Sequence, residues 1–429
     1  MKILFVSSSP LKKEISIGNT FINLFNGMSD VELASVYTRP GVPDVEISKA
    51  FCITEKMLVN NILNKTVAGV CIEERNVETS SGVVETKNEK RIKRIIKKHR
   101  WTVFFWMQKF IWNIGKWKSV ELKRFVEEYN PDIIFAVFSD ISFLNKLILH
   151  IKSITSKPLV LYAWDNNYSL KRIMFSPLKW IDHFMNRRMM RKTAKAADLM
   201  YVISDVQKED YEKAFDRSCK VLTKGYDFMT EVPRVGVFNE PLQLVYTGNI
   251  GMNRWKSLGH IANVLERINA DGIKAQLKIY TGNTVTKQMK AALEKTNTSF
   301  VMGTVSSNEV ERIQDQADVL VHVESMDLKN RLLVRQSFST KLVDYFYKAK
   351  CVLAFGPKEV ASISHLVKND AAIVADSEKE LENKLKKLIE MPGMLCEYQK
   401  KSWQCGSNNH QRDKFQNMLK QDFANILSM

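Results

Sequence analysis

Residues that could bind an anion gather in one short stretch, residues 336–346, which lies between the apolar runs 319–323 and 351–355. Strand, loop, helix and strand in this order form the crossover of a parallel sheet. The helix would start at the hydroxyl side chains, where free N–H groups and the helix dipole favour an anion. The residues concerned are Ser337, Ser339, Thr340, Lys341 and, one turn later, Asp344, whose carboxylate could accept from ribose hydroxyls. A Ser/Thr-capped core helix is the alternative interpretation of this stretch.

A glycine-rich turn with two following cations comes after another apolar run, residues 243–246. Backbone rich in glycine beside cations at the end of a strand is typical of a phosphate cradle. The spacing is not GxGxxG, so it does not indicate a dinucleotide fingerprint. The residues of this second pattern are Gly248, Asn249, Gly251, Arg254 and Lys256.

Near the N-terminus, a first strand at 2–6 leads into a polar loop that ends at Gly18 and Asn19, before a helix at 21–28. Glycine at such a position lets the backbone approach a ligand closely. A plain connection between strand and helix explains Gly18 equally well.

Two acids stand directly after apolar runs in the first half of the chain. Asp140 follows the run 131–138, and Asp165 follows the run 158–163. Open α/β sheets bind their ligands at the carboxyl ends of their strands. We therefore expect both carboxylates at the edge of a sheet where a substrate binds.

The elements that would position these residues form two successive α/β sets. Strands and helices alternate from residue 1 to about 230, and the Pro- and Gly-containing stretch 229–241 indicates a linker. A second alternating set occupies residues 241–395, and residues 396–429 are expected to be helical. The sequence thus predicts two parallel-sheet domains.

The totals point to an anionic partner and to a reducing compartment. The chain has 429 residues and a net charge of +17, which favours nucleic acid, anionic lipid or a phosphorylated substrate. Its six cysteines show no CxxC pair and no metal-ligand spacing, as expected of reduced cytosolic thiols. No apolar run reaches the roughly 18 residues of a membrane span.

Residues 85–125 form an insertion that differs from the rest of the chain. Residues 87–100 carry eight Lys or Arg against one acid, and four of the eight tryptophans follow within residues 101–117. Cations beside Trp and Phe favour a helix lying in an anionic membrane interface, together with the basic helix 179–195. The alternatives are an amphipathic core helix with a solvated basic face and, less favoured, single-stranded nucleic acid.

The order of these patterns resembles a GT-B glycosyltransferase, most closely the retaining family-4 enzymes of bacterial surface-polysaccharide biosynthesis. The resemblance covers most of the chain outside residues 45–125. It rests on Tyr246-Thr-Gly-Asn-Ile-Gly251 with Arg254, on Val323-Glu-Ser325, on Phe338-Ser-Thr-Lys341 with Asp344, and on Phe355-Gly-Pro357. It implies two Rossmann-like domains that face each other across a cleft, with the C-terminal helices packing back toward the first domain.

The resemblance also implies roles for single residues. Arg254 and Lys256 would bind the donor diphosphate, and the backbone at Gly303 and Val305 would hold the base. The two glutamates of the family, eight residues apart, fall on Gln336 and Asp344 here, which would face the donor sugar and the ribose. Glu324 is the candidate to replace the first of them, and Asp165 stands where relatives carry a His-Asp pair near the acceptor.

The expected function is transfer of a sugar, of the hexosyltransferase type, from a nucleotide-sugar donor to a polyprenyl-linked or oligosaccharide acceptor. The resemblance implies retention of configuration. No DxD motif occurs, so no metal and no other cofactor is expected. The protein would be cytoplasmic and peripheral on the inner face of the plasma membrane, without nucleic acid. The alternatives are a sugar-nucleotide epimerase of the same layout and a non-catalytic nucleic-acid-binding protein, for which the charge of +17 speaks.

Overall fold

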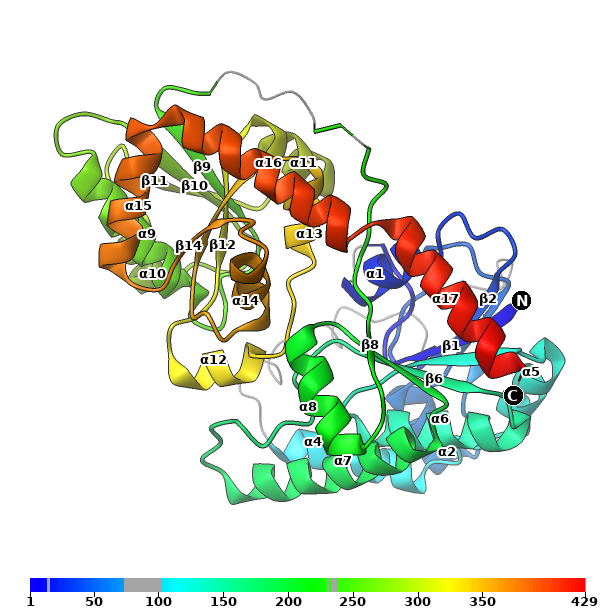
Figure 1. Cartoon of the computed structure of the whole chain (residues 1–429). Helices are drawn as coiled ribbons and strands as arrows, with labels where there is room; N and C mark the ends of the chain where they lie inside the picture. The colour runs from blue at the N-terminus through cyan, green and yellow to red at the C-terminus, as the bar shows by residue number, and fades with distance from the viewer. Residues whose placement is uncertain (14–15, 73–101, 230, 233–237, 429) are drawn as a thin grey trace. The chain divides into compact units, whose positions relative to one another are not determined.

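The structure is a computed structural model, and it describes the chain except for residues 14–15, 73–101, 230, 233–237 and 429. The chain divides into two compact units. The first unit comprises Met1–Thr223 with Phe415–Met429, and the second comprises Lys224–Lys414. Each unit is built on one largely parallel sheet covered by helices, which is the predicted α/β class (Figure 1).

The sheet of the first unit has eight strands in the order β4-β3-β2-β1-β5-β6-β7-β8. All neighbours are parallel except β3 and β4. The order reverses between β1 and β5, where open α/β sheets bind ligands. The strands are β1 (Lys2–Ser7), β2 (Glu32–Tyr37), β3 (Lys49–Cys52), β4 (Val70–Ile72), β5 (Ile133–Val137), β6 (Leu159–Ala163), β7 (Leu199–Val202) and β8 (Lys220–Val221).

Helices connect these strands and cover the sheet. They are α1 (Ser16–Phe25), α2 (Glu55–Asn64), α4 (Thr102–Ile114), α5 (Val120–Tyr129), α6 (Ser142–Thr155), α7 (Pro177–Ala196) and α8 (Asp205–Phe215). The last helix, α17 (Arg412–Leu427), belongs to this unit from Phe415 onward. Phe423 of α17 stacks on Phe25, and Tyr201 donates a hydrogen bond to Asp422 at 2.7 Å. These contacts bring the C-terminus back to the first unit.

The sheet of the second unit has six parallel strands in the order β11-β10-β9-β12-β13-β14. This is the order of a Rossmann fold, and it reverses between β9 and β12. The strands are β9 (Leu242–Thr247), β10 (Ala275–Tyr280), β11 (Ser299–Gly303), β12 (Val319–Val323), β13 (Cys351–Phe355) and β14 (Ile373–Ala375).

The helices of the second unit cover both faces of its sheet. They are α9 (Arg254–Ile268), α10 (Lys287–Leu293), α11 (Ser307–Gln316), α12 (Leu328–Val334), α13 (Lys341–Tyr347), α14 (Ala361–Lys368), α15 (Glu378–Glu390) and α16 (Pro392–Asn409). Of the two C-terminal helices, α16 packs on this unit, against α13 and β13. The strands β12 and β13 are buried throughout, as continuous apolar runs in a parallel sheet should be.

Candidate functional site

Two loops meet at the point where the strand order of the second sheet reverses. One follows β9 and contains Gly248, and the other comes after α12, which was not expected between β12 and the next helix, and leads to Lys341 at the start of α13. The Lys341 ammonium donates to the carbonyl of Thr247 at 2.9 Å. A Cβ atom on Gly248 would lie 1.9 Å from the Lys341 Nζ atom, and Gly248 also has a φ of +153°. Only glycine fits there, because the cation sits directly against the backbone.

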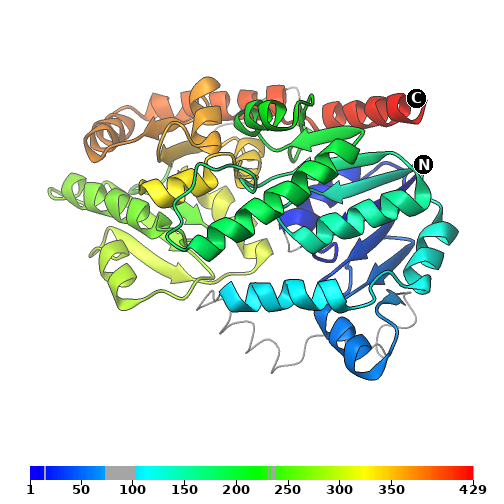
Figure 2. The same ribbon diagram turned by 90° about the horizontal axis from the view of Figure 1, so that it is seen from below.

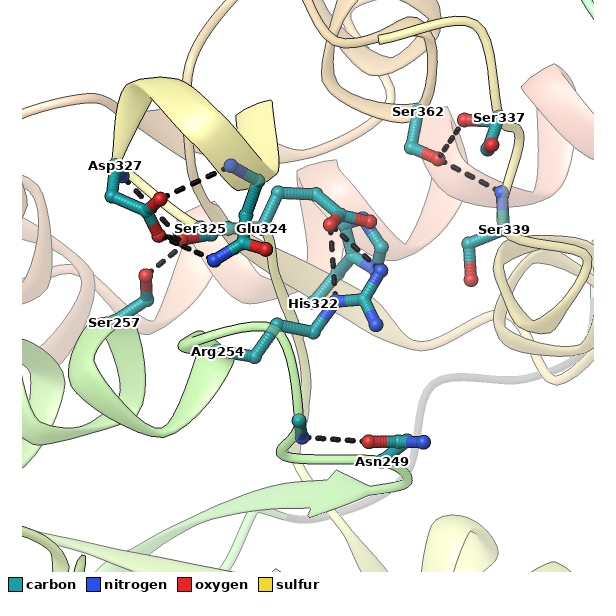
Figure 3. Close-up of polar contacts among 12 residues, drawn as sticks. Asn249, Arg254, Ser257, His322, Glu324, Ser325, Asp327, Ser337, Ser339 and Ser362 are labelled. Atoms are coloured by element: carbon teal, nitrogen blue, oxygen red, sulfur yellow. Dashed lines mark hydrogen bonds and ion pairs between the residues drawn. The ribbon is translucent and has the colours of Figure 1, made fainter. Parts of the chain in front are cut away.

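Arg254, the first residue of α9, pairs with a carboxylate at the end of β12. Its Nε and Nη2 atoms donate to the Oε2 atom of Glu324 at 3.0 and 2.9 Å (Figure 3). The Ser257 hydroxyl donates to the Glu324 carbonyl at 2.7 Å and ties α9 to the same strand end. The Nε2 atom of His322 lies 3.6 Å from the other Glu324 oxygen. Arg254 is thereby held in one orientation.

Burial shifts the pKa values of this cluster toward the neutral forms. It lowers the pKa of Lys341 to about 8, with the Arg254 charge acting in the same direction. It raises the pKa of Glu324, against the pull of Arg254. Burial and the charges of Arg254 and Lys341 lower the pKa of His322 to about 3, so that imidazole is neutral. Below pH 8, two cations face one carboxylate, and the excess positive charge suits an anion.

Asp344, on the first turn of α13, is held by two residues that sequence reasoning did not select. The Lys224 ammonium lies 2.6 Å from its Oδ1 atom, and the Tyr226 hydroxyl donates to the same atom at 2.7 Å. Tyr226 stacks on Tyr347 with ring centroids 4.3 Å apart. The other carboxylate oxygen, Oδ2, is the candidate to accept from a ligand. No local sequence pattern relates Lys224 and Tyr226 to a helix about 120 residues later.

The start of α13 differs from the predicted anion site. The Ser339 N–H donates to the Ser362 hydroxyl at 2.8 Å (Figure 3). The Ser337 N–H donates to the Val334 carbonyl at 2.9 Å. Thr340 stands at the N-cap position without a side-chain capping bond. The prediction that these N–H groups are free for an anion is therefore wrong for Ser337 and Ser339. Gln336 is completely buried.

The glycine-rich turn after β9 likewise uses its own donors. The Gly251 N–H donates to the Asn249 side chain at 2.6 Å, and the Ile250 N–H donates to Asn283 at 2.9 Å. The Gly248 N–H donates to the Tyr280 carbonyl at 2.9 Å. Three N–H groups of the turn are therefore already satisfied and do not form a cradle for an anion. The role left to the turn is to support Lys341 and Arg254.

Three other predicted donor-site residues lie apart from the Arg254–Glu324 pair. Lys256 is exposed, with its ammonium 5.6 Å from the centre of the Trp255 ring. Residues two positions apart on a helix face different ways, which explains why Lys256 does not join Arg254. Gly303 ends β11 with a φ of +83°, and Val305 follows in the loop. Both stand at the same carboxyl edge of the sheet, toward its β11 end.

In the first unit, Asp140 and Asp165 follow the neighbouring strands β5 and β6. Burial raises the pKa of Asp140, and the nearby Arg172 cation opposes this shift. Arg172 donates to the Asn166 carbonyl at 2.7 Å and lies 3.4 Å from the Nδ1 atom of His183. Arg172 was missed, because it lies in a loop that shows no periodicity. Asp165 itself is exposed, and its carbonyl accepts from Gln207.

His183 completes this polar group from α7. Burial and the Arg172 charge lower its pKa to about 4, so the ring is neutral near pH 7. Its Nε2 atom lies 3.1 Å from the Ser169 carbonyl, which can only accept. Nε2 therefore carries the proton and Nδ1 faces Arg172 as an acceptor. The described part of the first unit thus presents two acids, one cation and a neutral histidine at the ends of β5 and β6.

The N-terminal Gly18 was expected in the loop before the helix, and this placement is wrong. Gly18 lies within α1, not in a loop, and a Cβ atom on it would lie 2.2 Å from the Lys12 carbonyl oxygen. The Asn19 side chain donates to the Lys13 carbonyl at 3.3 Å. Glycine is needed at position 18 because the preceding loop packs on the helix.

The prediction that the tryptophans of residues 101–117 lie in a membrane interface is wrong for two of them. Trp112 and Trp117 are 1% and 6% exposed, and Trp112 stacks on Phe143 with ring centroids 4.4 Å apart. The Trp112 ring N–H donates to Glu55 of α2. These two rings form part of the core and are not interfacial anchors. The basic residues 87–100 and Trp101 lie outside the described residues.

No group of three or more His, Cys, Asp or Glu side chains in the described ranges is arranged to hold a metal ion. Within the same ranges, no helix has the length and apolar character that crossing a bilayer requires.

Comparison with solved structures supplies the fold class. HepE from Anabaena, solved in complex with UDP, superposes with a TM-score of 0.63 at 13% identity, over 99% of this chain and 100% of HepE. The fold is that of the GT-B glycosyltransferases. Sucrose-phosphate synthase from Thermosynechococcus elongatus gives a TM-score of 0.60 at 11% identity, over 100% of this chain and 99% of the synthase.

A third similar structure is the pneumococcal O-GlcNAc transferase GtfA in complex with UDP and GlcNAc. Its TM-score is 0.50 at 12% identity, over 72% of this chain and 60% of GtfA. No family model matches the sequence, and no curated relative matches it. At these identities the likeness concerns the fold, so the activity has to be argued from the residues of this chain.

Proposed function

We propose that this protein is a glycosyltransferase that takes a sugar from a nucleotide-sugar donor. The observation that carries the proposal is the convergence of Arg254 and Lys341 where the strand order of the second sheet reverses. Both cations are oriented by the protein, Arg254 by Glu324 and Lys341 by the Thr247 carbonyl. Dinucleotides and related phosphates bind at this place in Rossmann-like sheets.

The proposed chemistry follows from the leaving group. As the bond between the sugar and the diphosphate breaks, negative charge develops on the diphosphate. Fixed cations stabilise that charge without reorganising during the reaction. Each charge-assisted hydrogen bond contributes about 1.5–3 kcal/mol, so two cations supply a substantial part of the catalysis. Asp344 would bind the ribose through its Oδ2 atom, and the backbone at Gly303 and Val305 would contact the base.

The donor is proposed to be a uridine nucleotide sugar. Support comes from HepE and GtfA, which share the fold and whose structures contain UDP. Within the donor, the sugar would lie near Glu324 and Gln336. The reaction is proposed to be independent of a metal ion, because Arg254 and Lys341 already provide the positive charge. Retention of configuration and membership of family 4 are proposed from the sequence resemblance alone.

The acceptor is proposed to be a lipid-linked saccharide of surface polysaccharide or capsule synthesis. Asp140 and Asp165 would orient its hydroxyl group, with Arg172 near Asp140. Such an acceptor places the enzyme on the cytoplasmic face of the plasma membrane. This part of the proposal rests on the sequence resemblance and on the polar residues at the ends of β5 and β6.

A donor screen by thermal unfolding tests the proposal. A ligand that binds only the folded state at a hundred times its Kd stabilises by about 2.7 kcal/mol. We expect a UDP-sugar to raise the Tm by several degrees, equally with EDTA and with Mg²⁺. Lys341→Ala should reduce the shift to about half, as tenfold weaker binding does. Lys387→Ala, at an exposed lysine of α15, should retain it.

Further measurements on the same protein distinguish the transferase from the two alternative functions. An epimerase would convert the donor with no acceptor present, as seen by NMR of the sugar. A nucleic-acid-binding protein would show no shift with any UDP-, GDP- or dTDP-sugar, and would bind RNA with a steep salt dependence. Either result would refute the transferase. NMR of the product's anomeric proton decides between retention and inversion.

A further inference from the structure

An apolar strip runs along the solvent side of helix α4. Trp106, Met107, Phe110 and Ile114 are between 41% and 63% exposed. Phe110 and Ile114 come four and eight positions after Trp106, and Met107 is three before Phe110, so the four side chains lie on one face of the helix. The opposite face is buried, where Trp112 and Gln108 contact Glu55 of α2. The strip is therefore on the exposed side of the described part of α4.

Helix α7 presents a face of two halves to solvent. The first half is apolar, and the residues Leu178, Ile181, Phe184 and Met185 are between 48% and 55% exposed. One to three turns later, Arg188, Lys192 and Lys195 are exposed on the same side. Arg187 and Arg191 differ from these three cations, because both contact Tyr168. The acid of this helix, Asp182, is half-buried and faces α4.

The two helices are neighbours within the first unit. The Lys109 ammonium of α4 contacts Asp182 of α7 and donates to Asn186 at 2.7 Å. Both views place α4 and α7 on the same side of this unit (Figures 1 and 2), where Figure 2 shows α4 in cyan and α7 in green. Phe175, just before α7, is 89% exposed and extends the apolar area. We define the α4–α7 face by its eight apolar residues, Trp106, Met107, Phe110, Ile114, Leu178, Ile181, Phe184 and Met185.

We propose that the α4–α7 face docks on the surface of an anionic lipid bilayer. Exposed apolar areas of this extent mark interaction sites. The exposed Arg188, Lys192 and Lys195 continue the face along α7, and no acid is exposed on that side of the helix. Apolar side chains that enter the headgroup region beside cations that pair with lipid phosphates are the design of interfacial helices.

The inference deepens the proposed function, because it rests on a lipid-carried acceptor to give the surface its use. It also changes which residues are expected to contact the lipid. Phe110, Ile181 and Met185 replace Trp112 and Trp117 as the groups that enter the lipid. The cations of α7 supply attraction that depends on lipid charge and on salt.

Co-sedimentation of the full chain with vesicles tests the inference. Wild-type protein should bind vesicles of phosphatidylglycerol and phosphatidylcholine, and should bind pure phosphatidylcholine at least about tenfold more weakly. The triple variant Phe110→Ser, Ile181→Ser, Met185→Ser should lose at least about tenfold in binding. Its matched control, Ile273→Ser, Met302→Ser, Val367→Ser, removes three similarly exposed apolar residues of the second unit and should bind as wild type.

A second pair of variants isolates the charge. Arg188→Gln, Lys192→Gln, Lys195→Gln should remove most of the preference for phosphatidylglycerol. Lys379→Gln, Lys387→Gln, Lys400→Gln takes the same charge from exposed sites of the second unit and should keep the preference. Raising the salt concentration should weaken wild-type binding and leave the α7 charge variant almost unchanged.

Three results would overturn the inference. These are no binding of wild type to either vesicle, equal binding of the serine triple and its control, and a dimer in solution that the serine triple alone abolishes. The donor-induced rise in Tm is measured on every variant. If the vesicle test fails while that rise persists, the docking surface is wrong and the donor site stands. If the rise is absent in wild type, the proposed function fails whatever the vesicles show.

Discussion

The two sheets of this protein reverse their strand order at equivalent places, yet the carboxyl edges there carry different chemistry. In the second unit, Arg254, Glu324 and Lys341 are paired with one another or with backbone, and Glu324 is buried while the two cations are half-buried. In the first unit, Asp165 is exposed, and burial raises the pKa of Asp140. Enclosed and oriented charge suits stabilisation of a leaving group, and an accessible acid suits a hydroxyl that must arrive from solvent. In the proposed reaction, the second unit would therefore serve the donor and the first unit the acceptor, although both share one topology.

The largest expected effect comes from removing a cation of the second unit. Lys341→Ala and Arg254→Ala should each lower kcat about 10²–10³-fold, as loss of one oriented donor to a developing charge does. Arg254→Ala also leaves Glu324 buried without its partner, which destabilises the fold. Steady-state kinetics with a saturating UDP-sugar measure the first effect, and thermal unfolding measures the second.

A double variant separates these two effects. In Arg254→Ala with Glu324→Gln the buried carboxylate is gone, so stability should return toward wild type. Transfer should remain as low as in the single variant. Recovery of transfer in the double variant would show that Arg254 acts only as a counter-ion of Glu324.

The tryptophans of the first unit provide the next test. Trp112→Ala should lower the free energy of unfolding by about 3–5 kcal/mol, because a fully buried ring is removed. Trp106→Ala, at a side chain that is 41% exposed, should change it by less than about 0.5 kcal/mol. Urea unfolding measures both. Equal destabilisation would mean that α4 is buried on both sides, and the α4–α7 face would not exist.

These tryptophans also show which features of the structure could be predicted from the sequence and which could not. Apolar runs and their spacing predicted the two parallel sheets and the strand ends that carry Asp140, Asp165, Glu324 and Gly248. Composition alone could not show which tryptophans are buried and which are exposed. The side of α4 that is buried depends on Glu55 and Phe143, which are far away in sequence.

The same limit applies to the donor site. Lys341 was predictable from its place after a strand, but the pairing of Arg254 with Glu324 was not. Lys224 and Tyr226 follow the last strand of the first sheet and reach Asp344 only through the tertiary fold. The number of free N–H groups before α13 was overestimated. The Ser339 N–H donates to Ser362, a residue that follows the next strand and that the local sequence does not indicate as its partner.

Asp344 gives a third, smaller effect. Asp344→Ala should raise the donor KM about fiftyfold, because a charged acceptor for ribose hydroxyls contributes about 1.5–3 kcal/mol. Tyr226→Phe keeps the ring stacked on Tyr347 but removes one hydrogen bond to Asp344, and should raise KM only a few-fold. Initial rates against donor concentration measure both. An unchanged KM in Asp344→Ala would remove this residue from the ribose site.

Asp165 tests the first unit in the same way. Asp165→Asn should lower kcat about thirtyfold, since an acid that orients the acceptor hydroxyl loses its charge but keeps its shape. The donor-induced rise in Tm should stay as in wild type, because the donor site belongs to the second unit. Asp205→Asn, at an acid in the first turn of α8, is the control and should leave kcat unchanged. Loss of donor binding in Asp165→Asn would contradict the division of labour between the two sheets.

The pH dependence of donor binding is the smallest effect and the most specific to Lys341. Its pKa is lowered to about 8 because burial and the neighbouring Arg254 disfavour the ammonium form. Below pH 8 the side chain is a cation and attracts the diphosphate, and above pH 8 it becomes neutral. The donor KM should therefore rise about tenfold between pH 7 and pH 9, one decade for each unit above the pKa. Lys341→Arg keeps a charge throughout this range, so its KM, whatever its absolute value, should stay flat. A rise of equal size in Lys341→Arg would assign the titration to another group and leave the enclosed cation of the second unit without its expected signature.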